Sequence, residues 1–230
     1  MSDTPEGRPV VQHYSDVLCV WAYVANIRLE RLIERYRGRV DFELRCCSVF
    51  PDAVGKIGAA WEERGGFAAY GAHVQKVVGQ FDHVTVSPDV WSVTRPVSSS
   101  APHIMIKAAE LEERAGGAPA AGSARRFSWA LRRAFFEQGR DISCWDVLFD
   151  VAGAVGFDAG ALQEQLRSGA AAAALDRDIV AAQKAGISGS PTFYMNDGRQ
   201  ILYGNVGYRL LEANVEELLR PRGPDEASWY

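Results

Sequence analysis

Strand-forming segments lie near the two ends of this chain, and their separation restricts the fold more than any other feature. Residues 9–14 and 40–46 carry strand patterns, as do residues 192–195 and 200–203, whereas about 130 residues between them have helical patterns. Pairs of short strands are not stable alone, so the two ends must meet in one sheet. The sequence therefore predicts an α/β fold in which β-α-β and β-β-α halves form one unit. A large all-helical domain is inserted between the two halves.

Local patterns define the elements of this unit. In residues 20–36 apolar residues recur at helical spacing, and Gly38 ends the helix because glycine readily adopts the left-handed conformation. Residues 40–46 alternate between apolar and polar side chains, which is typical of a half-buried strand. This order predicts two parallel strands joined by a right-handed crossover. Near the other end, Asn196-Asp197-Gly198 between two strand patterns predicts a hairpin turn.

These patterns divide the chain into a first half of the sheet unit, a helical insertion, a second half and a C-terminal tail. The corresponding ranges are 1–50, 51–186, 187–220 and 221–230. Glycine and proline clusters separate the helices of the insertion. We predict these helices near residues 57–80, 98–115, 122–138, 144–155, 159–168 and 170–185. The tail ends in Trp229-Tyr230, a pair that is a candidate for docking onto the domain.

The composition excludes several classes of function. Hydrophobic residues make up 47% of the chain and charged residues 23%, as in ordinary globular proteins. The net charge of -4 does not favour a nucleic-acid partner, and Arg125-Arg126 and Arg132-Arg133 are interpreted as the solvated face of a helix. No apolar run approaches the ~18 residues of a membrane span, and the polar residues 1–8 lack the apolar core of a signal sequence. We therefore expect a cytoplasmic protein without a membrane partner.

The cysteines and histidines give no sign of a metal site. The four cysteines are too few for a disulfide scaffold and lack paired CxxC spacing, so we expect free thiols in a reducing compartment and no zinc. They are Cys19, Cys46, Cys47 and Cys144. Three histidines, His73, His83 and His103, lack a partner at metal-binding helical spacing, so we interpret them as structural or solvated. Cys144, at the start of a predicted helix, is also interpreted as structural.

Two motifs at opposite ends of the layout resemble the thioredoxin-like DsbA family. The segment Ser15-Asp16-Val17-Leu18-Cys19-Val20-Trp21-Ala22-Tyr23 lies where the first strand passes into the first helix. It is similar to the family pattern Asp-x-x-Cys-Pro-Trp-Cys-Tyr at the acid, the first cysteine, the tryptophan and the tyrosine. The segment Gly186-Ile187-Ser188-Gly189-Ser190-Pro191-Thr192-Phe193 resembles the cis-proline loop of the family. The resemblance covers nearly the whole chain and implies a thioredoxin-like fold.

Within this family the chain resembles FrnE-like proteins and the group of 2-hydroxychromene-2-carboxylate isomerases and kappa-class glutathione transferases. It departs from the redox pattern at two positions. Val20 replaces the proline, and Ala22 replaces the second cysteine of the redox pair. The isomerase and transferase group commonly has serine or alanine there. Cys19 is thus similar to the redox group, whereas Ala22 is similar to the isomerase group.

The position of Cys19 predicts a reactive thiol independently of the family. Unpaired N–H groups and the positive end of the helix dipole favour the thiolate, so we expect the pKa of Cys19 to lie below ~8.5. Asp16 either opposes this effect through its charge or caps the helix, and the cap is the favoured interpretation. The alternative for Cys19 is a small buried apolar residue.

Five further residues complete the predicted site. A cis Ser190-Pro191 bond would turn the backbone of Ser190 toward a substrate or cofactor, whereas a trans bond would make Pro191 an ordinary turn residue. By resemblance, Trp21 and Ala22 border the bound group, although packing is an equal alternative for Trp21. His13, on the first strand, is either a polar core residue or approaches the site from below.

Cys46 and Cys47 end the second strand, which places them at the same edge of the sheet as Cys19. Adjacent strand residues point to opposite faces, so at most one of the two is expected to face the site. Either residue is a candidate to resolve a mixed disulfide. Packing in the core is the default interpretation of both.

Three functional hypotheses follow. The first is a thiol-dependent oxidoreductase using Cys19 and a low-molecular-weight thiol of the glutathione or mycothiol type, because a lone cysteine cannot store a disulfide within its own motif. The second, by family analogy, is a thiol-cofactor-dependent isomerase or transferase acting on a small aromatic or polyketide-like substrate. The third is a redox-inactive binding module. The kappa-class relatives also suggest a homodimer formed through the inserted helices.

Overall fold

The computed structural model describes residues 8–220. Residues 1–7, which hold most of the polar start of the chain, and the tail with Trp229-Tyr230 lie outside the described residues.

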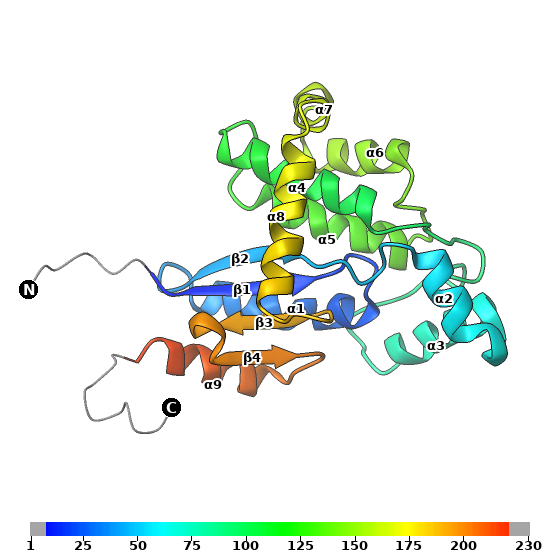
Figure 1. Ribbon diagram of the computed structural model, residues 1–230, viewed down its shortest axis with the longest axis horizontal. Helices are drawn as coiled ribbons and strands as arrows, with labels where there is room; N and C mark the ends of the chain where they lie inside the picture. The colour runs from blue at the N-terminus through cyan, green and yellow to red at the C-terminus, as the bar shows by residue number, and fades with distance from the viewer. Residues whose placement is uncertain (1–7, 221–230) are drawn as a thin grey trace, which may run out of the picture.

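The two ends of the chain form one four-stranded sheet in the order β2-β1-β3-β4 (Figure 1). β1 pairs in parallel with β2 and antiparallel with β3, and β3 and β4 form a hairpin. The strands are β1 (Val10–Ser15), β2 (Asp41–Cys46), β3 (Thr192–Met195) and β4 (Gln200–Tyr203). The predicted sheet unit and hairpin are therefore confirmed. Asn196 and Asp197 both adopt a positive φ in the turn between β3 and β4.

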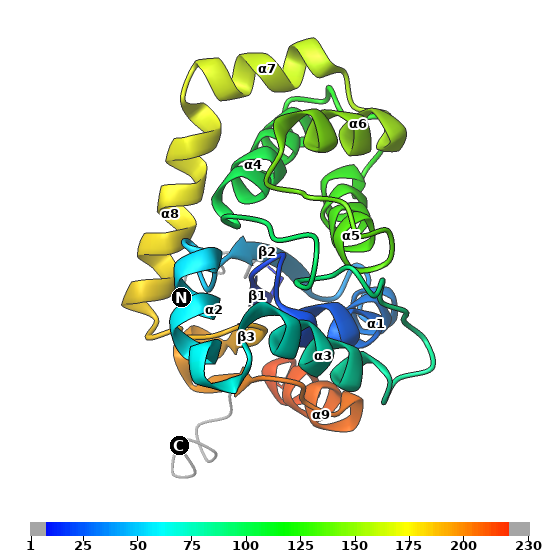
Figure 2. The ribbon, with the colours of Figure 1, turned by 90° about the vertical axis from the view of Figure 1, so that its right-hand side faces the viewer.

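Helices cover both faces of the sheet. α1 (Val20–Arg35) and α9 (Tyr208–Leu218) share one face, where Leu29 and Leu211 belong to the same buried cluster as Val11 and Phe193. α8 (Ala170–Lys184) crosses the opposite face, and Figure 2 shows the sheet between this helix and α1. The alternation of side chains along β1 decides this division, because successive residues point to opposite faces.

The inserted domain contains the helices from α2 to α8, and its element boundaries lie close to the predicted ones. Besides α8, they are α2 (Ala53–Trp61), α3 (Gly66–Val78), α4 (Ser100–Arg114), α5 (Ser123–Phe136), α6 (Trp145–Val155) and α7 (Ala159–Arg167). The prediction of one helix over 57–80 is wrong, because α2 and α3 are separated by a 3-10 turn at Glu62–Arg64. Gly65 and Gly66 follow with φ of 103° and 63°, and such backbone cannot continue a right-handed helix.

The main core belongs to the insertion and extends to the start of α1. Its largest fully buried side chains include Trp91, Phe127, Phe135 and Phe136, and Leu18 and Tyr23 join the same cluster. The segment between β1 and α1 is thus packed between two structural units. Among the helices of residues 8–220, none combines the length and the apolar character needed to cross a bilayer.

Candidate active site at the start of the first helix

Cys19 occupies the N-cap position of α1. Its backbone is extended, with φ -79° and ψ 116°, and its carbonyl accepts the amide N–H of Tyr23 at 3.0 Å. The side chain is 7% exposed. Its Sγ atom donates a hydrogen bond to the carbonyl oxygen of Ser190 at 3.2 Å. The fold therefore brings together two predicted site residues that lie far apart in the sequence.

The loop that carries Ser190 is bonded directly to the segment before Cys19. The Ser190-Pro191 peptide bond is cis. The hydroxyl of Ser190 accepts the amide N–H of Asp16 at 2.9 Å, and the hydroxyl of Thr192 donates to the carbonyl of Gly189 at 2.9 Å. These contacts fix the loop against the active-site segment.

Asp16 organises the loops around the site and does not cap α1. Its carboxylate is fully buried and accepts a hydrogen bond from the Leu18 amide at 2.9 Å, outside the helix. The amides of Val49 and Phe50 and the hydroxyl of Ser99 complete its partners, at 2.9, 2.9 and 2.7 Å. The predicted helix cap is therefore wrong, because these long-range donors satisfy the carboxylate.

Arg132 and His103, from the insertion, form hydrogen bonds to the segment between β1 and Cys19. The Arg132 guanidinium donates to the carbonyls of Asp16 at 2.8 Å and Val17 at 3.1 Å, and to the Ser15 hydroxyl at 2.9 Å. The Val17 amide donates to Nε2 of His103 at 3.1 Å. The prediction that Arg132 lies on a solvated helix face is wrong, because its side chain is buried against this segment.

The surroundings of Cys19 favour the neutral thiol. Burial raises the pKa of Cys19 above its ordinary value, and the charge of Asp16 adds to this effect. Hydrogen bonds with Ser190 and the Ala22 amide, together with the charge of Arg132, oppose it. The predicted lowering of the Cys19 pKa is therefore wrong for this structure, because desolvation outweighs the stabilisation from the helix start.

The other cysteines differ in their surroundings. Cys46 and Cys47 are buried, and burial raises the pKa of both, to about 12 for Cys46. The Sγ atom of Cys47 lies 3.8 Å from the carbonyl oxygen of Gly189, in the loop that also contacts Cys19. Cys46 lines a cavity on the α1 side of the sheet. Cys144 is exposed at the N-cap of α6, at the start of a helix as predicted, and its structural role stays a prediction.

Aromatic side chains surround the start of α1. Trp21 is 36% exposed, whereas Ala22 is buried. The Tyr23 hydroxyl donates to the carbonyl of Thr85 at 2.8 Å, so this tyrosine joins α1 to the insertion. Burial raises the pKa of Tyr70, on α3, and a thiolate at Cys19 would raise it further.

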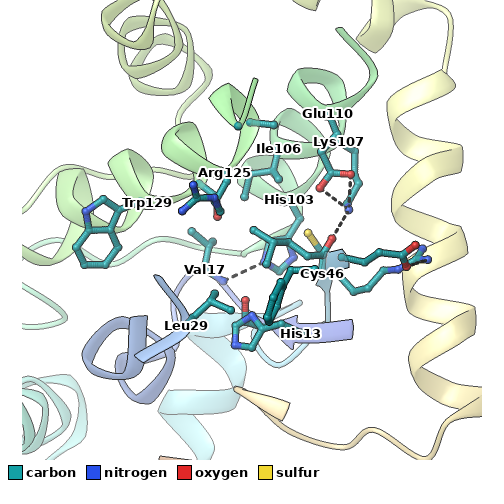
Figure 3. Close-up of a pocket in the computed structure, with 18 of the residues that line it drawn as sticks. His13, Val17, Leu29, Cys46, His103, Ile106, Lys107, Glu110, Arg125 and Trp129 are labelled. Atoms are coloured by element: carbon teal, nitrogen blue, oxygen red, sulfur yellow. Dashed lines mark hydrogen bonds and ion pairs between the residues drawn. The ribbon is translucent and has the colours of Figure 1, made fainter. Parts of the chain in front are cut away.

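A cavity of about 320 Å³ lies behind the active-site segment, between β1, β2, α1, α4 and α5 (Figure 3). His13, Val17 and His103 line it, but Cys19 does not. His13 is buried with its ring centroid 4.6 Å from that of Phe193, and burial lowers the pKa of His13 to about 3. His13 is therefore a buried polar residue, and its approach to the site stays a prediction.

Sequence reasoning missed Arg132, His103 and Tyr70. The two buried polar residues lie on α4 and α5, and only the packing of the insertion shows which turn of each helix faces the site. Residues 8–220 contain no group of three or more histidine, cysteine or acidic side chains that could hold a metal ion.

The fold and the site together define a thioredoxin-fold protein in which a cysteine at the start of α1 faces a cis-proline loop. The chain belongs to the DSBA-like thioredoxin domain family, whose model matches residues 10–216. No protein of curated function matches the chain in sequence.

Solved structures share this fold. A probable DsbA oxidoreductase from Streptomyces coelicolor is 18% identical with a TM-score of 0.72, covering 94% of this chain and 92% of that one. The cytosolic disulfide reductase DsbM from Pseudomonas aeruginosa is 20% identical with a TM-score of 0.65, covering 90% and 99%. A 2-hydroxychromene-2-carboxylate isomerase is 18% identical with a TM-score of 0.62, covering 91% and 95%. At these identities the similarity shows the fold.

Proposed function

We propose that the protein is a thiol-dependent oxidoreductase of the cytoplasm that acts through Cys19 alone. The observation that carries this proposal is the contact of the Cys19 thiol with the Ser190 carbonyl of the cis-proline loop at 3.2 Å, with Ala22 where a second cysteine would stand. An extended disulfide substrate aligned along this loop would present its sulfur atoms to Cys19. All four cysteines are free thiols, which suits a reducing compartment, and the DsbM structure is that of a cytosolic disulfide reductase.

The proposed reaction has two exchange steps. The substrate is a mixed disulfide with a low-molecular-weight thiol. The Cys19 thiolate attacks the sulfur of the small thiol and forms a new S–S bond with it. The substrate sulfur leaves as a thiolate and receives the proton that Cys19 lost. A second molecule of the small thiol then attacks the small-thiol sulfur that is bound to Cys19. The two small thiols leave as a symmetrical disulfide, and Cys19 is restored as a thiol. Glutathione or a mycothiol-type molecule would serve as the small thiol.

Cys47 is the alternative resolving group. Its sulfur atom points at Gly189, next to Ser190, and the charge of Cys19 is among the effects that raise its pKa. Cys46 is a weaker candidate because it faces the cavity beside Lys107. Intramolecular resolution would leave a Cys19–Cys47 disulfide, which peptide mapping detects.

Activity assays on cysteine variants test the proposal. We expect reduction of a glutathionylated peptide by glutathione, coupled to glutathione reductase, to fall about 100-fold in Cys19→Ser, because serine forms no mixed disulfide. The Cys144→Ser variant is the matched control, since Cys144 is the exposed thiol of the described chain and its loss should leave the rate unchanged. A mycothiol-dependent assay distinguishes the two small thiols. Full activity in Cys19→Ser would overturn the proposal.

A thiol-cofactor-dependent isomerase or transferase is the second candidate, favoured by the aromatic surroundings. The partly buried rings of Tyr70 and Trp61 lie with their centroids 5.2 Å apart, and the pKa of Tyr70 responds to the charge of a Cys19 thiolate. Such rings suit a flat aromatic substrate. In this case Cys19→Ser retains turnover of an aromatic substrate with glutathione, whereas a binding module shows no turnover with either residue.

A further inference from the structure

The cavity behind the active-site segment has an excess of cationic side chains. Five cationic and three acidic side chains line it, although the whole chain carries a net charge of -4. The three acidic residues already have partners. Glu110 accepts Lys107 at 2.8 Å, Glu113 accepts the Ala124 amide at 2.8 Å, and Glu43 accepts Arg45 at 2.6 Å.

Arg132 is the cation of this cavity that has no carboxylate partner among residues 8–220. It is 4% exposed, and its hydrogen bonds go to two backbone carbonyls and one hydroxyl. The carboxylate of Asp16, which raises the pKa of Arg132 against the dominant lowering by burial, is itself occupied by four donors. A buried cation without an ion pair is costly, so an anion beside it would be stabilised.

Two neutral imidazoles border the same space (Figure 3). Burial lowers the pKa of both His13 and His103, so each ring is neutral and carries one N–H at pH 7. His103 accepts the Val17 amide with Nε2, which leaves the proton on Nδ1. No hydrogen bond joins the His13 ring to another group of residues 8–220, so its N–H is free to donate to a ligand.

The lining also includes apolar side chains. Leu29, Ile106 and Trp129 line the cavity between α1, α4 and α5. A volume of about 320 Å³ accommodates a molecule of one ring with a short substituent. The donors of Arg132 and the histidines, together with these apolar side chains, suit a small ligand with one charged group and a short apolar body.

We propose that this cavity binds a small organic carboxylate, with the carboxylate accepting hydrogen bonds from Arg132 and the histidine rings and the apolar body lying against Ile106 and Trp129. This site is separate from the thiol chemistry proposed above, because Cys19 does not line it. The ligand would contact the groups that hold Val17, and would thereby be linked to the active-site segment.

Titration with benzoate tests the proposal, by calorimetry and by ligand-observed NMR on the whole chain. We expect benzoate to bind and benzamide, its neutral analogue, to bind at least tenfold more weakly, which corresponds to about 1.4 kcal/mol. Arg132→Met should weaken benzoate binding by a similar factor. The matched control is Arg133→Met, because the Arg133 side chain is 52% exposed and pairs with Glu137.

Two further measurements keep the test independent of folding defects and of the proposed activity. Ile106→Trp should fill the cavity and abolish benzoate binding while the circular dichroism spectrum stays native, whereas Cys19→Ser should bind benzoate like the original protein. A crystal soaked with 4-iodobenzoate should show the iodine between α4 and α1. The proposal is overturned by absent benzoate binding at millimolar concentrations, by equal binding of benzoate and benzamide, by iodine at another place, or by tighter binding of inorganic phosphate than of benzoate.

Discussion

At the scale of single residues, two opposing effects act on Cys19, and their relative size decides its state. The start of α1 favours a thiolate, typically by up to a kcal/mol or two, whereas removal of the sulfur from water favours the thiol by several pKa units in fully buried groups. The side chain is 7% exposed, and burial is the largest influence on its pKa. The resting site therefore holds a protonated cysteine that becomes nucleophilic when it loses this proton.

The pH dependence of alkylation checks this state. In a variant with Cys46, Cys47 and Cys144 replaced by serine, we expect the rate of Cys19 alkylation by iodoacetamide to rise with a midpoint above ~8.5, because burial raises the pKa. The same protein unfolded in urea provides the reference pKa of ~8.5. A midpoint below the unfolded reference would show that the helix start outweighs burial.

Asp16 is expected to contribute to stability through its four donors. Asp16→Ala leaves the Leu18, Val49 and Phe50 amides and the Ser99 hydroxyl without this acceptor, so we expect a loss of about 3 kcal/mol in the free energy of unfolding. Asp52→Ala is the control, because Asp52 caps α2 through one exposed contact with the Gly55 amide at 2.8 Å and should cost about 1 kcal/mol. Urea denaturation measures both, and equal losses would contradict the assigned role of Asp16.

At the scale of elements, the break between α2 and α3 illustrates how glycine conformation ends a helix. Residues 57–80 have apolar residues throughout, and this pattern alone predicts one continuous helix. The left-handed backbone at Gly65 and Gly66 instead turns the chain so that α3 packs against the main core through Val74 and Val78. The turn therefore brings Tyr70, also on α3, toward Cys19.

A pair of glycine substitutions tests this interpretation, with opposite signs expected. Gly65→Ala should lower the free energy of unfolding by about 1 kcal/mol, because alanine is strained at φ 103° and its Cβ would lie 3.2 Å from that of Ala69. Gly58→Ala, inside α2 with nothing within 4 Å of the added Cβ, should raise it by up to about 1 kcal/mol. Urea denaturation measures the free energy of unfolding of both variants. A higher value for Gly65→Ala than for the original protein would contradict the strained turn.

At the scale of the whole molecule, the insertion and the sheet unit act as one body at the site. Arg132 and His103 from the insertion hold the segment before Cys19, and Lys107 of α4 forms an ion pair with Asp178 of α8 at 2.5 Å beside β2. The carboxylate of Asp178 also accepts the Cys46 amide at 2.9 Å. Buried polar groups therefore join the two structural units, in addition to apolar contacts.

Acid should weaken the folded molecule through its buried histidines. Unfolded histidine binds a proton below pH ~6.5, whereas folded His13 does so near pH 3, so the free energy of unfolding falls as pH decreases between these values. From pH 6.5 to pH 5 the contribution of His13 amounts to about 2 kcal/mol. We expect His13→Phe to reduce the pH dependence of the urea midpoint by this amount, with His103 contributing equally in both proteins. An unchanged dependence would show that His13 does not titrate in this way.

The sequence by itself determined the sheet unit, the position of Cys19 and the existence of the helical insertion. Side-chain alternation, helical spacing and the turn at Asn196-Asp197-Gly198 act over a few residues, so they are visible without knowledge of the fold. The same locality explains the agreement of most helix boundaries with the structure.

The tertiary structure alone decided the surroundings of Cys19. Asp16 does not cap α1 but accepts hydrogen bonds from donors more than thirty residues away. Arg132 lies against the active-site segment, and burial raises the pKa of Cys19. Each of these facts depends on which groups from distant segments replace water around a polar atom. Hydrogen bonding and desolvation are properties of the packed interior, and periodicity along the chain does not encode them.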